Sequence, residues 1–324
     1  MTAPCQLRLS TVWRLGYRRR MVWQATLINA IIFPSWLDST AFSIGPISIE
    51  WYGIAYVVGL VLAYLYAARV AETTRYWVPS GPTRGPQIVP TRDDLGDLMF
   101  YAFIGILAGG RLGYVLFYDT DMLWTDPLQI ILGIRGGGMS FHGGFLGVCA
   151  AVGYAAWRKN TSYMRFADLA WVGAPIGLGL VRVTNFVNQE LYGHPTDMPW
   201  GVIFPNAPDS LPRHPSQLYE AFLEGLILWL ILRFMTKRGA LSKPGLITGA
   251  GVAGYGVFRF MVEFVRTPDP IPQFGMLTRG MAYSLPMVIV GLIVILWASR
   301  RQAVSPHYVA KSEPASEEAT ADNG

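Results

Sequence analysis

Charged residues are scarce in this chain of 324 residues. Asp, Glu, Lys and Arg make up 15% of it and hydrophobic residues 52%, whereas a soluble domain usually carries about 25% charged residues. The charge is missing from runs of roughly 20 residues, the length of helix that crosses a hydrocarbon core. Because lipid offers no hydrogen-bond partner to backbone groups, such runs must be helical. The sequence therefore predicts an integral membrane protein.

Cysteine and histidine are also rare, with two and four residues. Cys5 lies in a basic N-terminal tail and Cys149 in an apolar run, so they have neither a disulfide framework nor a metal-binding spacing. The histidines have no paired spacing either. We therefore expect no metal site.

Apolar runs predict an all-α fold, a polytopic bundle of about seven transmembrane helices with a short external head region. The predicted spans are Tyr52–Ala71, Leu98–Tyr118, Met139–Trp157, Ala167–Val187, Leu218–Met235, Leu246–Phe264 and Ala282–Ser299. The polar tail at 301–324 has no apolar period and is predicted to be disordered. The chain thus divides into a basic or interfacial N-terminal extension (1–41), a membrane domain (42–300) and a cytoplasmic tail (301–324).

The formal net charge is +5. In a soluble protein this excess would suggest a nucleic-acid partner, but here Lys and Arg lie mainly in the loops after the first, third, fifth and seventh spans. Positive loops face the cytoplasm. The sequence therefore predicts no nucleic-acid binding, a cytoplasmic C-terminus and an external loop at Glu190–His214. Arginines before Met21 contradict this orientation, which favours Met21 as an alternative start.

Ionisable side chains lie within these apolar runs, where each costs roughly 3 kcal/mol or more. They are Arg111, His142, Asp168, Arg182, Glu220, Glu224, Arg259 and Glu263. One interpretation is that they pair with one another and only hold helices together. Their number in one small bundle favours a functional site.

Two helix faces carry most of these groups. Arg182, Asn185 and Gln189 are spaced i, i+3, i+7 and are predicted to share one face, which suits a phosphate because Arg can bind it in a bidentate way. The alternative is an Arg–Glu pair with a capping Asn. On the other face, Arg259 and Glu263 can pair as i, i+4 neighbours, and Glu263 could also direct Arg259 toward a ligand.

Two histidines lie near predicted span ends. His142 follows a glycine-rich segment, and a His at the membrane edge can titrate near neutral pH and act as a base. A structural role is the alternative. His214 opens the fifth span, where it is interpreted as a cap, an interface residue or a catalytic residue.

Seven short motifs occur in order between about residue 42 and residue 300. They are Phe42 to Pro46, Trp51 to Gly53, Gly109 to Tyr114, Gly137 to Gly144, Arg182 to Glu190, His214 to Glu220 and Tyr255 to Arg266. Together they resemble the bacterial prolipoprotein diacylglyceryl transferases. Three features depart from that family: an N-terminus longer by about 25 residues, Val181 and Thr184 where it tends to have Gly, and Met281 where it usually has Gln.

The resemblance implies a reaction without a cofactor. The diacylglyceryl group of phosphatidylglycerol moves to the thiol of the lipobox cysteine in a prolipoprotein signal peptide, which forms a thioether and releases glycerol phosphate. It also implies a multi-pass protein of the bacterial inner membrane, in contact with membrane lipid. We expect a monomer.

The resemblance and the helix faces together predict the site. The predicted catalytic residues are His142, Arg182, Tyr255 and Arg259. The predicted substrate-binding residues are Tyr52, Arg111, Gly143, Asn185, Asn188, Glu190, Gly193, His214, Glu263 and Arg266. His142 is the candidate base, although the thiolate could form without it, and the arginines are expected to stabilise the charge that the leaving phosphate gains.

Two other functions fit the same pattern. A transporter or channel for an anionic solute also needs intramembrane Arg and Asn, but no internal repeat is evident. A lipid-binding scaffold without catalysis would tolerate the loss of His142 and Asn185. Substrate turnover distinguishes all three.

Overall fold

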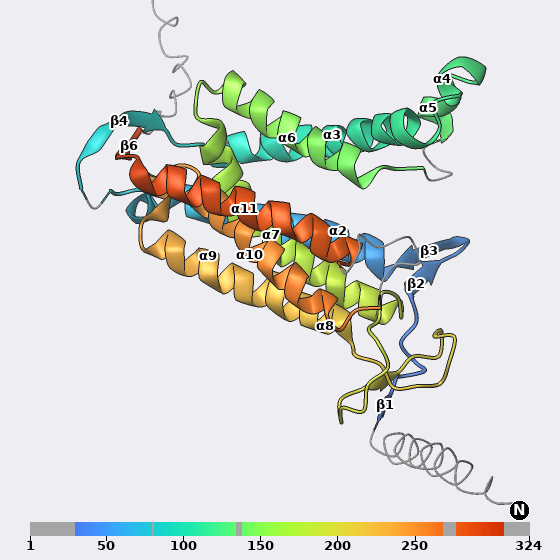
Figure 1. Ribbon diagram of the computed structural model, residues 1–324. Coiled ribbons are helices and arrows are strands. Elements are labelled where there is room, and N and C mark those ends of the chain that lie inside the picture. Colours follow the sequence, from blue (N-terminus) through green and yellow to red (C-terminus); the bar gives the residue numbers. More distant parts are fainter. Residues whose placement is uncertain (1–29, 80, 134–137, 268–276, 308–324) are drawn as a thin grey trace, which may run out of the picture. The chain divides into compact units, whose positions relative to one another are not determined.

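The computed structural model describes residues 30–79, 81–133, 138–267 and 277–307, and these are mostly helical (Figure 1). Helices occupy all seven of the ranges predicted as spans, so the prediction that these ranges are helical is confirmed. These helices are α2 (Trp51–Glu72), α3 (Arg92–Tyr118), α6 (Phe141–Arg158), α7 (Tyr163–Val187), the run α8 (Ser216–Glu220), η3 (Ala221–Ile227) and α9 (Leu228–Lys237), then α10 (Leu246–Glu263) and α11 (Arg279–Arg300). Short helices α4 (Met122–Thr125) and α5 (Gln129–Leu132) follow α3.

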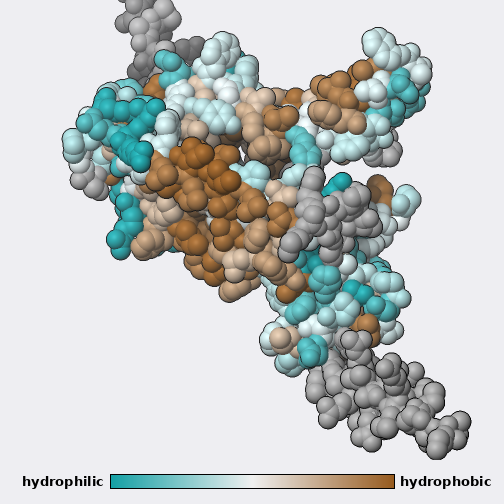
Figure 2. Space-filling view, viewed as in Figure 1, coloured by the Kyte–Doolittle hydropathy of each residue, from teal (hydrophilic) through white to brown (hydrophobic). Residues whose placement is uncertain are grey.

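Four of the described helices, α2, α3, α7 and α11, are long and apolar enough to cross a membrane. Apolar side chains gather on the surface of the molecule over α9 to α11 (Figure 2). Phe234 on α9 and Ile293 on α11 are both 59% exposed. A large exposed apolar surface of this kind fits a lipid environment.

The chain divides into two compact units. The first comprises residues 1–66, 170–234 and 248–296, and the second comprises residues 67–169, 235–247 and 297–324. The first unit therefore holds most of α2, α7, α10 and α11, together with α8, η3 and most of α9.

Small residues let the helices of the first unit pack closely, as is common between membrane helices. A Cβ added to Gly59 of α2 would lie 3.0 Å from the Cα of Gly177 in α7. A Cβ added to Gly225 of η3 would lie 2.7 Å from the Cα of Gly179 in α7. The same helix α7 therefore contacts both neighbours through nearly bare backbone.

A small head region lies at one end of the first unit. Strand β1 (Ile31–Ile32) pairs in parallel with β5 (Val202–Ile203). Phe33 packs there in a core with Val202 and Phe204. The strands β2 (Thr40–Ile44) and β3 (Ile47–Glu50) form an antiparallel hairpin just before α2.

The last residues of the predicted extension at 1–41 belong to this head and to the hairpin. Residues 1–29, and with them the alternative start at Met21, lie outside the described residues.

The second unit contains the hairpin of α3 and α6 and a pair of parallel strands. Strand β4 (Thr83–Ile88) pairs with β6 (Ala303–His307). Val304 is buried, so this part of the tail is ordered and the predicted disorder from residue 301 is wrong there.

Candidate functional site

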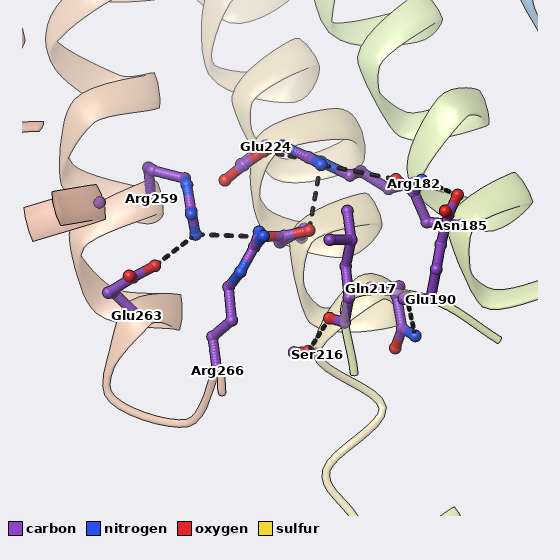
Figure 3. Close-up of polar contacts among 12 residues, drawn as sticks. Arg182, Asn185, Glu190, Ser216, Gln217, Glu224, Arg259, Glu263 and Arg266 are labelled. Carbon is purple, nitrogen blue, oxygen red and sulfur yellow. Dashed lines mark hydrogen bonds and ion pairs between the residues drawn. The ribbon is translucent and has the colours of Figure 1, made fainter. Parts of the chain in front are cut away.

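Glu220 is the centre of a charged cluster in the first unit. Figure 3 shows the arginines of this cluster, Arg182, Arg259 and Arg266. The carboxylate of Glu220 is fully buried, yet three guanidinium groups reach it. Oε2 lies 3.2 Å from Nε of Arg182, and Oε1 lies 3.1 Å from Nη1 of both Arg259 and Arg266. These arginines come from α7, from α10 and from the segment after α10. One carboxylate therefore joins separate parts of the chain.

Arg182 lies between two carboxylates. Its Nε is 3.4 Å from Oε2 of Glu224, one helical turn beyond Glu220. Glu220 directly precedes the π-helical segment η3, and Glu224 lies within it. A π-helical distortion is common at functional sites. The close contact of Gly179 with Gly225 brings the backbones together at the same level. The Arg–Glu pair that the sequence offered as an alternative role for Arg182 is therefore present in the structure.

Arg259 is paired with Glu263, as the i, i+4 spacing predicted. Nη1 of Arg259 lies 2.8 Å from Oε2 of Glu263. The other oxygen of Glu263 accepts a hydrogen bond of 2.8 Å from the hydroxyl of Thr278, just before α11. Arg266 lies beyond the last residue of α10, yet it reaches the same Glu220 as Arg259.

Asn185 connects the cluster to a second set of polar groups. Its Nδ2 donates to the hydroxyl of Tyr52 at 2.5 Å and to Oε1 of Glu190 at 2.8 Å. Its Oδ1 accepts a long hydrogen bond of 3.5 Å from Nη1 of Arg182. The amide therefore fixes Tyr52 and Glu190 next to that guanidinium.

The turn that holds Glu190 has an unusual backbone. Gln189 and Leu191, on either side of it, have φ angles of 55° and 59°, which are costly for residues with a side chain. Buried Gln217 donates to the carbonyl of Glu190 at 2.6 Å, and Ser216 donates to that of Leu191 at 2.8 Å. Strain of this kind persists where the surroundings fix it.

The prediction that Gln189 shares a helix face with Arg182 is wrong. Helix α7 ends at Val187, and Oε1 of Gln189 accepts a hydrogen bond from the backbone of Asn206. Neighbouring Asn188 has a buried Oδ1 with no hydrogen-bond partner among the described residues.

Gly193 and His214 lie in the loop between α7 and α8. The amide of Gly193 donates to the carbonyl of His214 at 2.8 Å, and Gly193 also bridges to Arg266. Nδ1 of His214 lies 3.1 Å from the hydroxyl of Tyr219. Burial and the nearby His194 lower the pKa of His214, so the ring is neutral near pH 7 and fits a structural contact here.

Three predicted site residues lie in the second unit. Arg111 is buried and donates to the carbonyls of Ile130 at 2.8 Å and Gly138 at 3.1 Å. The backbone amide of Gly143 donates to Oγ of Ser140, the N-cap residue of α6, at 3.3 Å. His142 is exposed at the start of the same helix. These contacts give Arg111 a structural role in the loop before α6, and its substrate role stays a prediction.

Several predicted residues of the first unit lie together in one polar cluster. Arg182, Arg259 and Arg266 are joined through Glu220, and Tyr255 lies beside Arg182. The carboxylate of Glu220 is hidden, whereas the side chains of Arg182 and Arg259 keep 16% and 15% exposure. The accessible part of the site is thus rich in cationic donors, which suits an anionic ligand.

Sequence reasoning missed four residues of this site. Glu220 and Glu224 were noticed as intramembrane charges but not placed in the site, and Ser216 and Gln217 were not singled out. The i, i+4 spacing of Glu220 and Glu224 within an apolar run was the available signal. Among the described residues, no cluster of three or more metal-ligand side chains occurs.

Comparisons with known proteins agree on one family. Residues 39–297 match the family described as "Prolipoprotein diacylglyceryl transferase". A "Phosphatidylglycerol--prolipoprotein diacylglyceryl transferase" of Rhodopseudomonas palustris is 44% identical over 295 residues, which cover 90% of this chain and 99% of that protein. Proteins of the same name from Brucella anthropi and Brucella canis are 43% and 44% identical, each covering 85% of this chain and 96% of the relative.

Proposed function

The chain belongs to the prolipoprotein diacylglyceryl transferase family, and we propose that the cluster around Glu220 is where its reaction takes place. As a transferase of lipoprotein maturation, it moves the diacylglyceryl group of phosphatidylglycerol to a cysteine thiol of a prolipoprotein. A carbon–sulfur bond forms and a carbon–oxygen bond breaks. Glycerol phosphate leaves, and the thiol proton is released.

The observation that carries this proposal is the joint attachment of Arg182 and Arg259 to Glu220, at 3.2 and 3.1 Å. The leaving phosphodiester becomes a phosphate monoester and gains negative charge. Guanidinium groups that are already fixed stabilise that charge without reorganising. Glu220 and Glu263 fix them from the buried side, and the remaining N–H groups are available to the phosphate.

Asn185, Tyr52 and Glu190 are proposed to position the lipid head group. The Asn185 amide links the other two side chains and also contacts Arg182. A phosphatidylglycerol head group carries hydroxyls, which hydrogen-bond well to carboxylates and amides. This set therefore suits the glycerol end of the lipid.

The nucleophile belongs to the peptide substrate, so the enzyme needs no cysteine of its own. A free thiol has a pKa of about 8.5 and reacts as the thiolate. His142 remains the proposed base, and its alternative role is to position substrate. Replacement by Ala and by Asn distinguishes these roles, because Asn keeps hydrogen bonding but accepts no proton.

Membrane topology is part of the proposal, with about seven spans. Helix α6 has 18 residues, α10 carries Arg259 and Glu263, and the run from α8 to α9 contains a π segment and two glutamates. Each of these three segments is shorter or less apolar than α2, α3, α7 and α11. Packing against neighbours would allow them to span.

Contacts between loops favour an alternating topology. In the second unit, the loop after α2 pairs with the segment after α11 as β4 with β6, and Thr161 after α6 donates to Ile88 at 2.8 Å. Lys243, after α9, donates to Ser299 at 2.8 Å. These loops carry the basic residues, so we propose that they face the cytoplasm of a bacterial cell with the C-terminus.

The test is mass spectrometry of a lipobox peptide incubated with the purified protein and phosphatidylglycerol. A diacylglyceryl mass gain is expected with this lipid, but not with phosphatidylethanolamine. The gain should be lost in Arg182→Ala and kept in Arg233→Ala, since Arg233 contacts Tyr66 and not the cluster. No gain with any lipid, from folded protein, rejects the proposal.

A further inference from the structure

Glu220 and Glu224 compete for one nitrogen atom. They are one turn apart, both have fully buried carboxylates, and their Oε2 atoms lie 3.2 and 3.4 Å from the same Nε of Arg182. Two negative charges this close in a buried site repel each other. Such pairs commonly settle with one of the two carboxyl groups protonated.

The two glutamates differ in their partners. Glu220 also binds Arg259 and Arg266, each at 3.1 Å. Among the described residues, Glu224 has an ion-pair contact only with Arg182, and neither of its oxygens has a hydrogen-bond partner. A buried carboxylate without such partners is costly, so the neutral form is favoured at the site with fewer cations.

The remaining neighbours of Glu224 do not change this comparison. Arg259 and Tyr255 on α10 lie within electrostatic reach, as do Arg182 on α7 and Glu220 on the same helical run. Arg259 is already held by Glu220 and Glu263 at 3.1 and 2.8 Å. No second guanidinium is therefore dedicated to Glu224.

A proton on one of these glutamates would change the net charge of the cluster. Three arginines (Arg182, Arg259, Arg266) face three glutamates (Glu220, Glu224, Glu263). With these six groups ionised their charges cancel, so the ion-paired cluster has no net charge to attract an anion. With one glutamate protonated it carries one positive charge, which matches the single negative charge of a phosphodiester.

We propose that Glu224 carries a proton in the resting enzyme, so that the cluster around Arg182 keeps a net positive charge for the phosphate of the lipid. Glu224 is thus a positioning residue that sets the charge of the site through Arg182. This inference rests on the proposed function. It adds that binding of the anionic lipid weakens as the pH rises and Glu224 loses its proton.

Matched variants test this proposal. Glu224→Gln is close in shape to a protonated glutamate, so we expect transfer activity within about tenfold of the wild type, whereas Glu220→Gln should lose about 100-fold or more. The KM for phosphatidylglycerol should rise with pH in the wild type and stay level in Glu224→Gln. A merely structural glutamate would not move this pH profile.

Infrared spectroscopy gives a readout that needs no turnover. The band of a protonated carboxyl group should be present in the wild type and absent from Glu224→Gln. Absence of that band from the wild type overturns the inference, and so does a folded Glu224→Gln as inactive as Glu220→Gln. An inactive wild type that shows the band would instead reject the proposed function and leave the charge assignment standing.

Discussion

Gly179 and Gly225 face each other where α7 meets η3, and a Cβ added to Gly225 would lie 2.7 Å from the Cα of Gly179. Gly179 precedes Arg182 by one helical turn, and Gly225 directly follows Glu224. The distance between these two backbones therefore sets how far Arg182 must reach to its carboxylates. Glycine at this contact is a condition for the charged cluster.

Gly225→Ala should therefore separate the two helices. The added methyl group cannot fit without movement of the backbone, and overpacking of this kind costs about 1–3 kcal/mol of stability. We expect a lower midpoint of thermal unfolding and a transfer rate reduced at least about tenfold, since small displacements of catalytic groups are costly.

The matched control is Gly177→Ala, also on α7. A Cβ there would lie 3.8 Å from Gly59, an ordinary contact. It should leave both measurements nearly unchanged, and equal damage from the two substitutions would contradict the argument.

Asn185→Asp should disconnect the two halves of the polar site. The substitution removes the amide donor to Tyr52 and Glu190 and places a negative charge beside Glu190. We expect activity to fall by about 10- to 100-fold, since each lost buried hydrogen bond costs about 1–3 kcal/mol. Kinetics at several concentrations of phosphatidylglycerol measure it. Tyr52→Phe removes only one acceptor and should have the smaller effect.

Stability should depend on pH through His214. Its pKa is lowered in the folded protein by burial and by His194, so the folded state binds fewer protons than the unfolded state as pH falls below about 6.5. Stability is therefore full above that pH and is lost on acidification. Thermal unfolding between about pH 7.5 and 5 measures this trend.

His214→Asn supplies the comparison. Asn can still accept a hydrogen bond from Tyr219 but does not titrate, so its unfolding midpoint should fall less between the same pH values. An identical slope in both proteins would assign the acid sensitivity to other groups.

Removal of β6 should destabilise the second unit. A chain ending at Gln302 lacks the strand that pairs with β4 and the buried side chain of Val304. The expected loss is about 2–4 kcal/mol, from one buried side chain and several hydrogen bonds. A chain ending at His307 keeps the strand and should unfold at the higher temperature. Equal unfolding temperatures would show that the pairing contributes little.

The helices could be predicted from the sequence because an apolar run of the right length has few other solutions in a membrane. The pairing of Arg259 with Glu263 was equally accessible, since i, i+4 neighbours on one helix contact each other whatever surrounds them. Both predictions depend only on local geometry.

The contacts of Glu220 at the centre of the site could not be predicted from local geometry. Spacing places Glu220 on a helix face but does not tell which arginines of other segments reach it. Gln189 failed for a related reason: the periodicity continued past Val187, where the backbone turns with positive φ at Gln189 and Leu191. The spacing of residues along a helix does not predict where the helix ends when no glycine marks its C-terminus.

Strands β4 (Thr83–Ile88) and β6 (Ala303–His307) lie far apart in the sequence, and every helix from α3 to α11 is synthesised between them. β4 leaves the ribosome early, whereas β6 appears only in the last stretch of translation. The second unit therefore stays open through most of biosynthesis and closes after insertion of the helices. A premature stop before β6 would leave β4, made long before, with an unpaired strand edge, which is a target for proteolysis and aggregation.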